Sequence, residues 1–333
     1  MQQRAAKLLP KRPANEDGRP ARPTICTFHS LCVRILRRHI EKLGYKRNFV
    51  IYNESEQLGV VKKILAAICG REVKADPREL HGLLSRLKNA GPGGKVLGNE
   101  ESLAMAETLR RRYDTALRAC NAVDFDDLLV LTLRLFEEHP DALEQCRARY
   151  RYVMVDEYQD TNAAQFELMR ALAAEHRNVC VVGDDDQSIY SWRGADIRNI
   201  LEFETQFEST TVVRLERNYR STGNILTAAN SVISKIQARA EKVLWTEREN
   251  GKPAAVIEAF DEDDEATQVE SEIRVLCGSD VERRDIAIVY RTNAQSRAFE
   301  DALLFENIPY TVVGALSFYQ RREIKDCLLY TSP

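Results

Sequence analysis

Two patterns of apolar positions divide the chain. Between residues 54 and 145 the apolar side chains recur at helical spacing without strand-like alternation, which indicates a helical region. From residue 151 the pattern changes to short apolar runs, RYVMV at 151–155 and RNVCVV at 177–182, with a helical stretch between them. Strand–helix–strand alternation is typical of a parallel sheet. The sequence therefore predicts an α/β sheet with a helical region ahead of it.

Further elements follow from the same spacing. The helical region predicts four helices, over 55–69, 78–89, 101–120 and 125–138. A short strand-like start at Thr24 leads into an earlier helix that ends near Gly44. A helix is also expected near 195–203. Four later apolar segments predict additional strands, at 211–215, 254–260, 285–290 and 310–313.

The composition is that of a globular chain. Its 333 residues are 44% apolar and 30% charged, enough for a sizeable core in about two domains. No run of about eighteen apolar residues occurs, and the first residues have no apolar signal region, so neither a membrane segment nor a secretory signal is expected. The eight cysteines are scattered without a C-x-x-C pair, which favours reduced thiols in the cytoplasm.

Positive charge is concentrated at the start of the chain. Residues 1–48 hold twelve Lys or Arg against three acids, a local net charge of +9, and because the whole chain carries −3 the remainder carries −12. This asymmetry suggests a phosphate-binding face on an otherwise acidic body. A solvated basic arm is the alternative interpretation of the same residues.

Two carboxylates stand at the end of the first apolar strand. VMVDE at 153–157 would deliver Asp156 and Glu157 to the carboxyl edge of a parallel sheet, where open α/β sheets bind ligands. In nucleotide hydrolases an Asp at such a strand end holds Mg²⁺, and a following Glu can orient or deprotonate the attacking water. A helix N-cap is the structural alternative.

The next strand ends in a second acidic loop. GDDDQS at 183–188 should lie beside DEYQDT at the same edge of the sheet. Carboxylates and amides from both loops would then crowd together: Asp156, Glu157, Gln159, Asp160, Asp184, Asp185 and Gln187. Uncompensated carboxylates repel one another, and a metal–phosphate ligand would relieve that repulsion. Gln187 is suited to contact a γ-phosphate or its water because an amide adds no charge.

Large aromatic side chains follow in the same loop. Tyr190, Trp192 and Arg193 are residue types that stack on unpaired bases, at about 1–3 kcal/mol per base. A tryptophan buried in a domain interface is the alternative. A phosphate sensor joined to a base-stacking surface would couple the nucleotide state to the grip on a nucleic-acid strand.

Three long motifs carry a family resemblance: DEYQDTN at 156–162, GDDDQSIYSWRGAD at 183–196 and LERNYRSTGNIL at 215–226. They resemble motifs II, III and IV of the UvrD/Rep/PcrA-type superfamily 1 DNA helicases. Four more stretches are similar to family motifs, namely CTFHSLC at 26–32, VDFDDLL at 123–129, YRTNAQSRAFEDAL at 290–303 and FYQRREIKD at 318–326. The resemblance extends from Thr24 to Tyr330 and keeps the family order.

The resemblance implies a nucleotide site with ATP and Mg²⁺ as cofactors. Asp156 would hold Mg²⁺, Glu157 would activate water, and Gln187 would sense the γ-phosphate. Tyr219 would stack on the adenine. Arg220 would contact the γ-phosphate from the second motor domain, as an arginine finger does.

The resemblance also implies a DNA site. Single-stranded DNA would be contacted by Thr27, Phe28, His29, Tyr190, Trp192 and Arg193. By itself, His29 would be interpreted as a satisfied surface or core histidine. The expected partners are single-stranded DNA and its junctions with duplex, with repair or replication proteins as further partners and no membrane.

The implied fold is a P-loop NTPase with two RecA-like, parallel-sheet motor domains, both incomplete. Residues 1–48 and 146–208 would form part of the first motor domain, 49–145 its helical insertion, and 209–333 part of the second. No G-x-x-x-x-G-K-[ST] phosphate loop occurs, because GPGGK at 91–95 lacks the Ser or Thr. The chain is therefore expected to be a middle fragment of such an enzyme.

The resulting prediction is an ATP-dependent 3′→5′ DNA helicase of repair or replication, whose 333 residues alone do not hydrolyse ATP at a helicase-like rate. The alternative is a non-enzymatic DNA- or partner-binding remnant of the same fold. The presence of Glu157, Gln187 and Arg220 argues against the remnant, which would be free to lose them.

Overall fold

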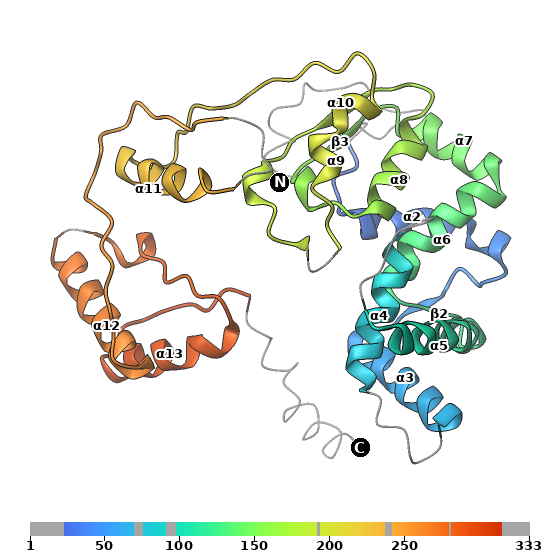
Figure 1. The fold of residues 1–333 in the computed structure, drawn as a ribbon, viewed down its shortest axis with the longest axis horizontal. Coiled ribbons are helices and arrows are strands. Elements are labelled where there is room, and N and C mark those ends of the chain that lie inside the picture. The colour runs from blue at the N-terminus through green and yellow to red at the C-terminus, as the bar shows by residue number, and fades with distance from the viewer. Residues whose placement is uncertain are drawn as a thin grey trace, which may run out of the picture. The chain divides into compact units, whose positions relative to one another are not determined.

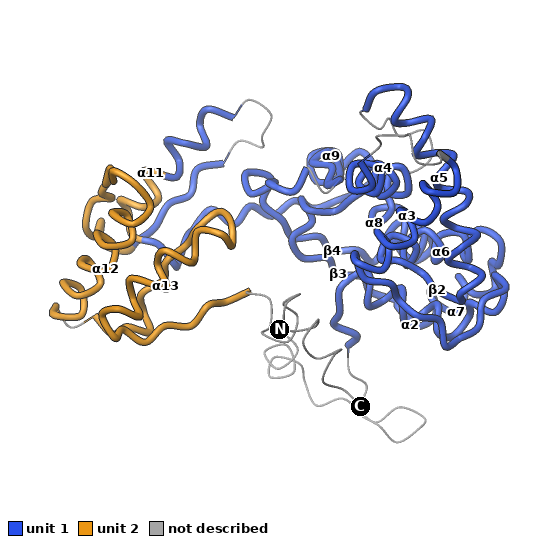
Figure 2. Tube along the Cα trace, turned by 90° about the horizontal axis from the view of Figure 1, so that it is seen from below, with its two compact units in different colours: residues 1–221, 229–247 blue, residues 222–228, 248–333 orange. Residues whose placement is uncertain are grey.

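The computed structural model describes residues 23–69, 76–90, 98–191, 194–236, 242–279 and 281–314. They divide into two compact units, which Figure 2 shows in different colours. Unit 1 comprises residues 1–221 and 229–247, and unit 2 comprises residues 222–228 and 248–333. None of the described helices is long and apolar enough to cross a membrane.

The main core of unit 1 is built by four helices (Figure 1), α2 (Phe28–His39), α6 (Phe125–Glu138), α7 (Pro140–Arg149) and α8 (Ala163–Ala173). Helix α2 buries Cys32, Ile35 and Leu36. Helix α6 begins at a capping box in which the Asp124 and Asp127 carboxylates each accept from the other residue's backbone N–H. Because α6 packs against both α2 and α8, the first helix and the helix after DEYQDT share one core.

A second core holds three helices of the predicted insertion at 49–145, namely α3 (Glu54–Cys69), α4 (Pro77–Asn89) and α5 (Glu100–Ala119), whereas α6 of the same predicted segment packs in the main core. These bounds lie within one residue of the predicted ones. The start of α4 is set by an Asp76 cap followed by Pro77, and the start of α5 by an Asn99 cap. Val61, Leu80 and Leu109 meet at the centre of this core, each no more than 3% exposed.

A short strand pair joins the two cores, where the sequence predicted only helices. Strand β1 (Val50–Ile51) pairs in parallel with β2 (Ala122–Val123), and Val50 lies opposite Ala122. Two-residue strands carry too little alternation to be recognised in a sequence. They bring together the segment before α3 and the segment after α5.

The predicted parallel sheet is present as β3 (Val153–Val155) and β4 (Val179–Val181), with Met154 opposite Cys180. Helix α8 connects the two strands and contacts β3, so the strand–helix–strand prediction is confirmed here. Two short helices, α9 (Arg198–Leu201) and α10 (Phe203–Gln206), follow close to the predicted helix.

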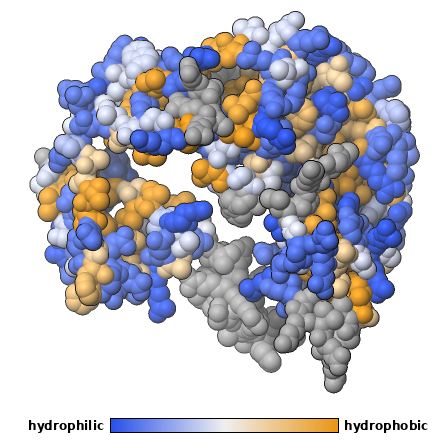
Figure 3. Space-filling model, viewed as in Figure 1, coloured by the Kyte–Doolittle hydropathy of each residue, from blue (hydrophilic) through white to orange (hydrophobic). Residues whose placement is uncertain are grey.

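The prediction of four later strands was wrong. Segments 211–215, 254–260, 285–290 and 310–313 are all described, and none of them is a strand. Val256 is 99% exposed and Val289 is 91% exposed, so their apolar pattern meets no paired neighbour, and a strand exists only where a neighbour completes the hydrogen-bond ladder. Orange apolar surface is visible over unit 2 in Figure 3.

The regular structure after residue 221 is helical. Helix α11 (Gly223–Ile233) runs across the boundary between the two units, and α12 (Glu262–Gly278) packs against α13 (Ser296–Phe305) within unit 2. The Asp261 carboxylate caps α12 by accepting from the N–H groups of Asp263 and Asp264. The α12–α13 contact buries Ile273 and Phe299.

Candidate functional site

The loops that follow β3 and β4 lie side by side, as the sequence predicted for parallel neighbours. The Val182 N–H donates to the Val155 carbonyl at 2.8 Å, and the Tyr158 N–H donates to the Val182 carbonyl at 2.9 Å. These two backbone bonds extend the sheet ladder beyond its last paired residues. The DEYQDT and GDDDQS loops are therefore joined directly by their main chains.

Gln159 connects the same two loops through its side chain. Its Nε2 donates to Glu157 Oε2 at 2.8 Å, and its Oε1 accepts from the Asp184 N–H at 3.0 Å. The residue is 1% exposed, so both ends of the amide are used inside the protein. Gly183 makes room for it, since a Cβ at that position would lie 2.6 Å from Gln159 Oε1 and 3.1 Å from the Tyr158 nitrogen. The sequence placed Gln159 among the crowded side chains but not in this bridging role.

Glu157, the predicted water-activating residue, has a strained backbone. Its φ of 52° and ψ of 46° lie in the left-handed region, which a glutamate rarely adopts. Such conformations persist where the surroundings hold them, and they are concentrated at functional sites. Here the Gln159 amide and the Tyr158–Val182 bond hold the turn, and the Glu157 residue remains exposed.

Asp156, the predicted Mg²⁺ ligand, is also exposed at the end of β3. Its Oδ1 accepts from the Glu157 N–H at 3.1 Å. Carboxylate oxygens are hard ligands of the kind that Mg²⁺ takes, so an exposed carboxylate at this strand end fits the ion. Its role as a ligand stays a prediction.

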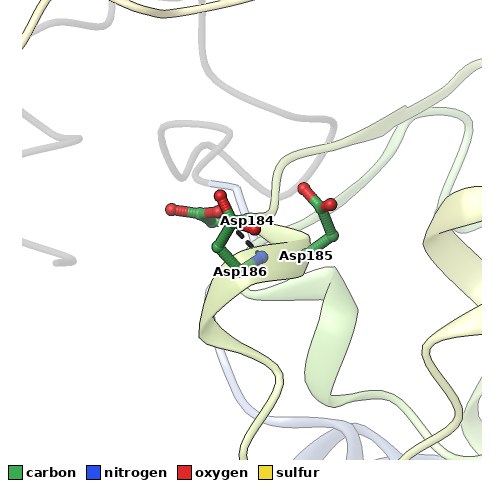
Figure 4. Close-up of side chains that lie close together, drawn as sticks. All are labelled: Asp184, Asp185 and Asp186. Carbon is green, nitrogen blue, oxygen red and sulfur yellow. Dashed lines mark hydrogen bonds between the residues drawn. The ribbon is translucent and has the colours of Figure 1, made fainter. Parts of the chain in front are cut away.

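Three consecutive aspartates form the most acidic part of the site (Figure 4). One carboxylate oxygen each from Asp184, Asp185 and Asp186 lies within 4.8 Å of the others. Asp184 anchors the turn, because its Oδ1 accepts from the Asp186 N–H at 3.1 Å and its Oδ2 accepts from Gln187 Nε2 at 2.7 Å. The predicted phosphate sensor, Gln187, is thus held by the first aspartate of its own loop.

Lys242 compensates the charge of these aspartates. Its ammonium lies 2.5 Å from Asp184 Oδ1 and 3.4 Å from Asp186 Oδ2, and it also pairs with Asp185. Burial by itself would raise the pKa of Asp184, but hydrogen bonds from Lys242 and Gln187 hold that pKa below its ordinary value. Burial likewise opposes the charge of Lys242, and bonds to Asp184 and Asp185 outweigh it, so the lysine pKa is raised.

The sequence interpretation missed Lys242. It expected a metal–phosphate ligand to relieve the crowded carboxylates, whereas in this structure a lysine of the same chain contacts two of them, Asp184 and Asp185, together with Asp186. Lys242 lies 57 residues after Asp185, and no local pattern connects the two positions. Only the fold brings the cation to the acids.

The predicted DNA-contacting residues at 27–29 start helix α2. Thr27 is its N-cap, accepting from the Ser30 N–H at 3.3 Å. Phe28 packs against the main core and against a smaller apolar cluster that includes Val155 and Tyr158. The ring of His29 lies 5.6 Å from that of Phe125, centroid to centroid. Burial lowers the pKa of His29 against the opposing effect of Asp126. Each of the three residues thus has a structural role at the start of α2, and their contacts with DNA stay predictions.

The second part of the predicted DNA surface is only partly visible. Tyr190 is half-buried, and its carbonyl accepts from the Ala195 N–H at 3.3 Å. Trp192 and Arg193 lie outside the described residues. Asp196 donates its N–H to the Thr161 carbonyl at 3.0 Å, so the chain after the predicted stacking residues is bonded to the DEYQDT loop.

Tyr219 and Arg220 lie in the turn before α11. The Tyr219 side chain is exposed, and the Arg217 guanidinium is 4.8 Å from the centre of its ring. The Asn218 Oδ1 accepts from the Arg220 N–H at 2.9 Å and from the Ser221 N–H at 2.7 Å, which fixes the turn. An exposed aromatic face followed by an arginine suits the predicted contacts with a base and a phosphate.

Two protein-family models match the chain. The UvrD/REP helicase N-terminal domain matches residues 1–208, and the UvrD-like helicase C-terminal domain matches residues 213–332. The ATP-dependent DNA helicase PcrA of Staphylococcus epidermidis is 44% identical over 331 residues, covering 98% of this chain and 45% of the relative. The ATP-dependent DNA helicase PcrA of Staphylococcus aureus is 45% identical over 307 residues, covering 91% and 42%. The chain thus spans less than half the length of these curated relatives.

Proposed function

Because the chain belongs to the UvrD/REP helicase family, we propose that its residues act in an ATP-dependent DNA helicase that moves 3′→5′ along single-stranded DNA. One observation carries the proposal. The DEYQDT and GDDDQS loops are bonded to each other through Gln159 and through the main chain, with Glu157 and Gln187 on the two sides of that bridge. A water-activating group and a phosphate sensor need such a fixed relation.

We propose that the residues divide the work of phosphoryl transfer. Asp156 holds Mg²⁺, whose charge when bound offsets that of the phosphates. Glu157 accepts the proton of the attacking water, and Gln187 contacts the γ-phosphate through its amide. Tyr219 stacks on the adenine, and Arg220 contacts the γ-phosphate as an arginine finger.

We propose that the same loop grips DNA. Tyr190 lies three residues after Gln187, and with Trp192 and Arg193 it forms the stacking surface, while Thr27, Phe28 and His29 contact the strand from the start of α2. A movement of Gln187 toward the γ-phosphate is then transmitted to the stacked bases through a few residues of backbone. The partners are single-stranded DNA and its junctions with duplex, in the bacterial cytoplasm.

The test is DNA-stimulated ATP hydrolysis by a protein that carries these residues together with a phosphate loop. Glu157→Gln should lower kcat by about 10²–10⁴-fold, as expected for loss of a general base, while leaving DNA affinity unchanged. Turnover that survives the substitution would contradict the assignment. The 333 residues contain no G-x-x-x-x-G-K-[ST] motif, so robust ATP turnover by this chain alone would also contradict the proposed mechanism.

The alternative, a non-enzymatic DNA- or partner-binding remnant, is favoured by that same missing motif. The two proposals differ in what the site residues are for. In a remnant there is no ATP hydrolysis for Glu157→Gln and Gln187→Ala to remove, whereas in the helicase these substitutions lower ATP hydrolysis and leave DNA binding unchanged.

A further inference from the structure

A pocket of about 350 Å³ lies between helices α2 and α7, away from the loops described above. Of the described residues that line it, none is acidic. Its basic residues are Arg34, Arg37, Arg38 and His39 from α2 and Arg149 from α7. Four arginines around one small volume make a strongly positive site.

The arginines converge by geometry. Arg34, Arg37 and Arg38 are spaced three and four residues apart, so they share one face of α2, and like charges at this spacing repel one another. Arg37 is held in place, since it donates to the Arg47 carbonyl and its guanidinium lies 3.8 Å from the centre of the Phe49 ring. Within the part of the chain that the structure describes, Arg34 and Arg38 form no ion pair.

A second pocket, on the other side of α7, contains acidic as well as basic residues and so differs from the arginine pocket. It has a volume of about 450 Å³, and its basic residues Arg147 and Arg151 are accompanied by Glu144 and Glu175. Arg147 pairs with Glu175 at 2.5 Å. On that side Arg147 is neutralised by an acid of the same pocket, whereas no described acid pairs with Arg34, Arg38 or Arg149 of the arginine pocket.

Stabilisation of helix ends explains only part of the arrangement. Cations in the last turn of a helix are favourable, and Arg37, Arg38 and Arg149 occupy such positions. Arg34 lies more than one turn before the end of α2. The helix dipole therefore does not account for all four arginines on one pocket.

The buried neighbours respond to the positive field. The pKa of His39 is lowered by burial and further by Arg38, Lys42 and Arg47, against Asp141. Burial raises the pKa of the Cys146 thiol to about 11, and Arg38 and Arg149 oppose that rise. Both groups meet a surplus of positive charge.

We propose that this arginine pocket binds phosphates of a DNA backbone, as a contact separate from the base-stacking residues. Guanidinium groups recognise phosphate oxygens in a bidentate way, and backbone contacts of this kind are independent of sequence. Arg34 and Arg38 lie about 9 and 15 Å along α2 from Phe28 at a rise of 1.5 Å per residue, so DNA held at the start of the helix could continue to the pocket. The inference rests on the proposed function, since that function makes DNA the polyanion.

The test is the salt dependence of DNA binding by the 333-residue chain. A triple variant, Arg34→Gln with Arg38→Gln and Arg149→Gln, removes the exposed guanidiniums and keeps Arg37 on Phe49. The control variant, Arg134→Gln with Arg170→Gln and Arg177→Gln, removes the same charge from arginines that are paired with acids. Thermal unfolding followed by circular dichroism verifies that both variants are folded.

Fluorescence anisotropy with a single-stranded and a duplex oligonucleotide, each at several salt concentrations, gives the slope of log K against log salt. Three lost phosphate contacts should reduce that slope by about 2 for the single strand or about 2.7 for the duplex, and the arm that changes identifies the source of the phosphates. The control should keep the wild-type slope.

Equal slopes for the triple variant and the wild-type chain would overturn the pocket proposal alone. A wild-type chain that binds neither oligonucleotide would overturn the DNA function as well. Tyr190→Ala should weaken binding without changing the slope, which separates stacking from charge.

Discussion

Two lysines in unit 1 each contact three aspartates, and the difference between them is instructive. Lys88 pairs with Asp124 at 2.9 Å, Asp127 at 2.6 Å and Asp114 at 3.5 Å, and its side chain is 2% exposed. Lys242 pairs with Asp184, Asp185 and Asp186, and its side chain is 17% exposed. A cluster of one lysine and three aspartates thus occurs twice, once among the packed helices of the α3–α5 core and once in the candidate site.

The Lys88 cluster belongs to the architecture. It connects α4, α5 and the capping box of α6, and the ammonium also lies 4.9 Å from the centre of the Tyr113 ring. Burial alone would lower the pKa of Lys88, but the three carboxylates raise it above its ordinary value. The ammonium and the three carboxylates of this cluster thus compensate one another within the protein.

The Lys242 cluster belongs to a loop. Its aspartates come from consecutive positions, so they are close together whatever the fold does, and the lysine is brought to them from a distant segment. Water reaches part of this cluster, because the side chains of Lys242 and Asp184 are 17% and 26% exposed. We infer that the buried cluster stabilises the fold, whereas the loop cluster sets the charge of the site.

The largest effect is expected for Lys88→Met. Removing the ammonium leaves the buried carboxylates of Asp124 and Asp127 uncompensated, which should lower the free energy of unfolding by about 3–5 kcal/mol. Urea unfolding followed by circular dichroism measures the change. A loss below about 1 kcal/mol would mean that the buried cluster is no more structural than a surface ion pair.

A pH effect should follow from Asp127. Burial raises its pKa to about 6, against the lowering effect of Lys88. A folded pKa above the unfolded value means that the folded state binds more protons, so this contribution to stability is complete below about pH 4 and is lost as the pH rises through 6.

The size of that contribution is about 3 kcal/mol, from two pKa units at 1.36 kcal/mol each. Unfolding free energies of the wild-type chain and of Asp127→Asn, measured from pH 4 to 7, should therefore diverge, with the wild-type chain losing stability relative to the variant. Parallel curves would show that Asp127 is ionised throughout this range.

A smaller loss is expected for Gln159→Met, which keeps the side-chain length and removes both hydrogen bonds. The buried Asp184 N–H would lose its acceptor, at a cost of about 1–3 kcal/mol. Amide hydrogen exchange at Asp184 should also become faster, because its N–H loses the Gln159 acceptor. Unchanged exchange in both loops would show that the main-chain bonds alone hold the pair together.

The smallest effect is expected for Lys242→Met. Because water reaches the Lys242 ammonium and the Asp184 carboxylate, the loss should be about 1 kcal/mol, and it should shrink further as salt increases. The matched comparison is with Lys88→Met under the same conditions. An equal loss of unfolding free energy in the two variants would show that the Lys242 cluster is as structural as the Lys88 cluster.

Local patterns predicted much of this protein. Helices α3, α4 and α5 begin and end within one residue of the prediction. Capping residues such as Asp76 and Asn99 stand directly before the apolar pattern of the helix that they begin. The neighbouring positions of DEYQDT and GDDDQS followed from one rule, that parallel strands end at the same edge.

The later strands and the short β1–β2 pair could not be predicted in the same way. An apolar run such as 254–260 indicates side chains that suit a sheet, but strand formation depends on a partner elsewhere in the chain. Conversely, Val50–Ile51 is too short to show a period and pairs only because Ala122 lies beside it.

The sequence by itself determined the residue types of the candidate site, the family motifs and the two loops that carry Glu157 and Gln187, since each of these is local. Only the tertiary structure decided which groups compensate the charge: Lys242 for the loop aspartates, Lys88 for the buried ones, and no described acid for Arg34, Arg38 and Arg149 of the arginine pocket. The physical reason is that electrostatic energy depends on distance and burial in space, and neither quantity can be read from positions that lie tens of residues apart.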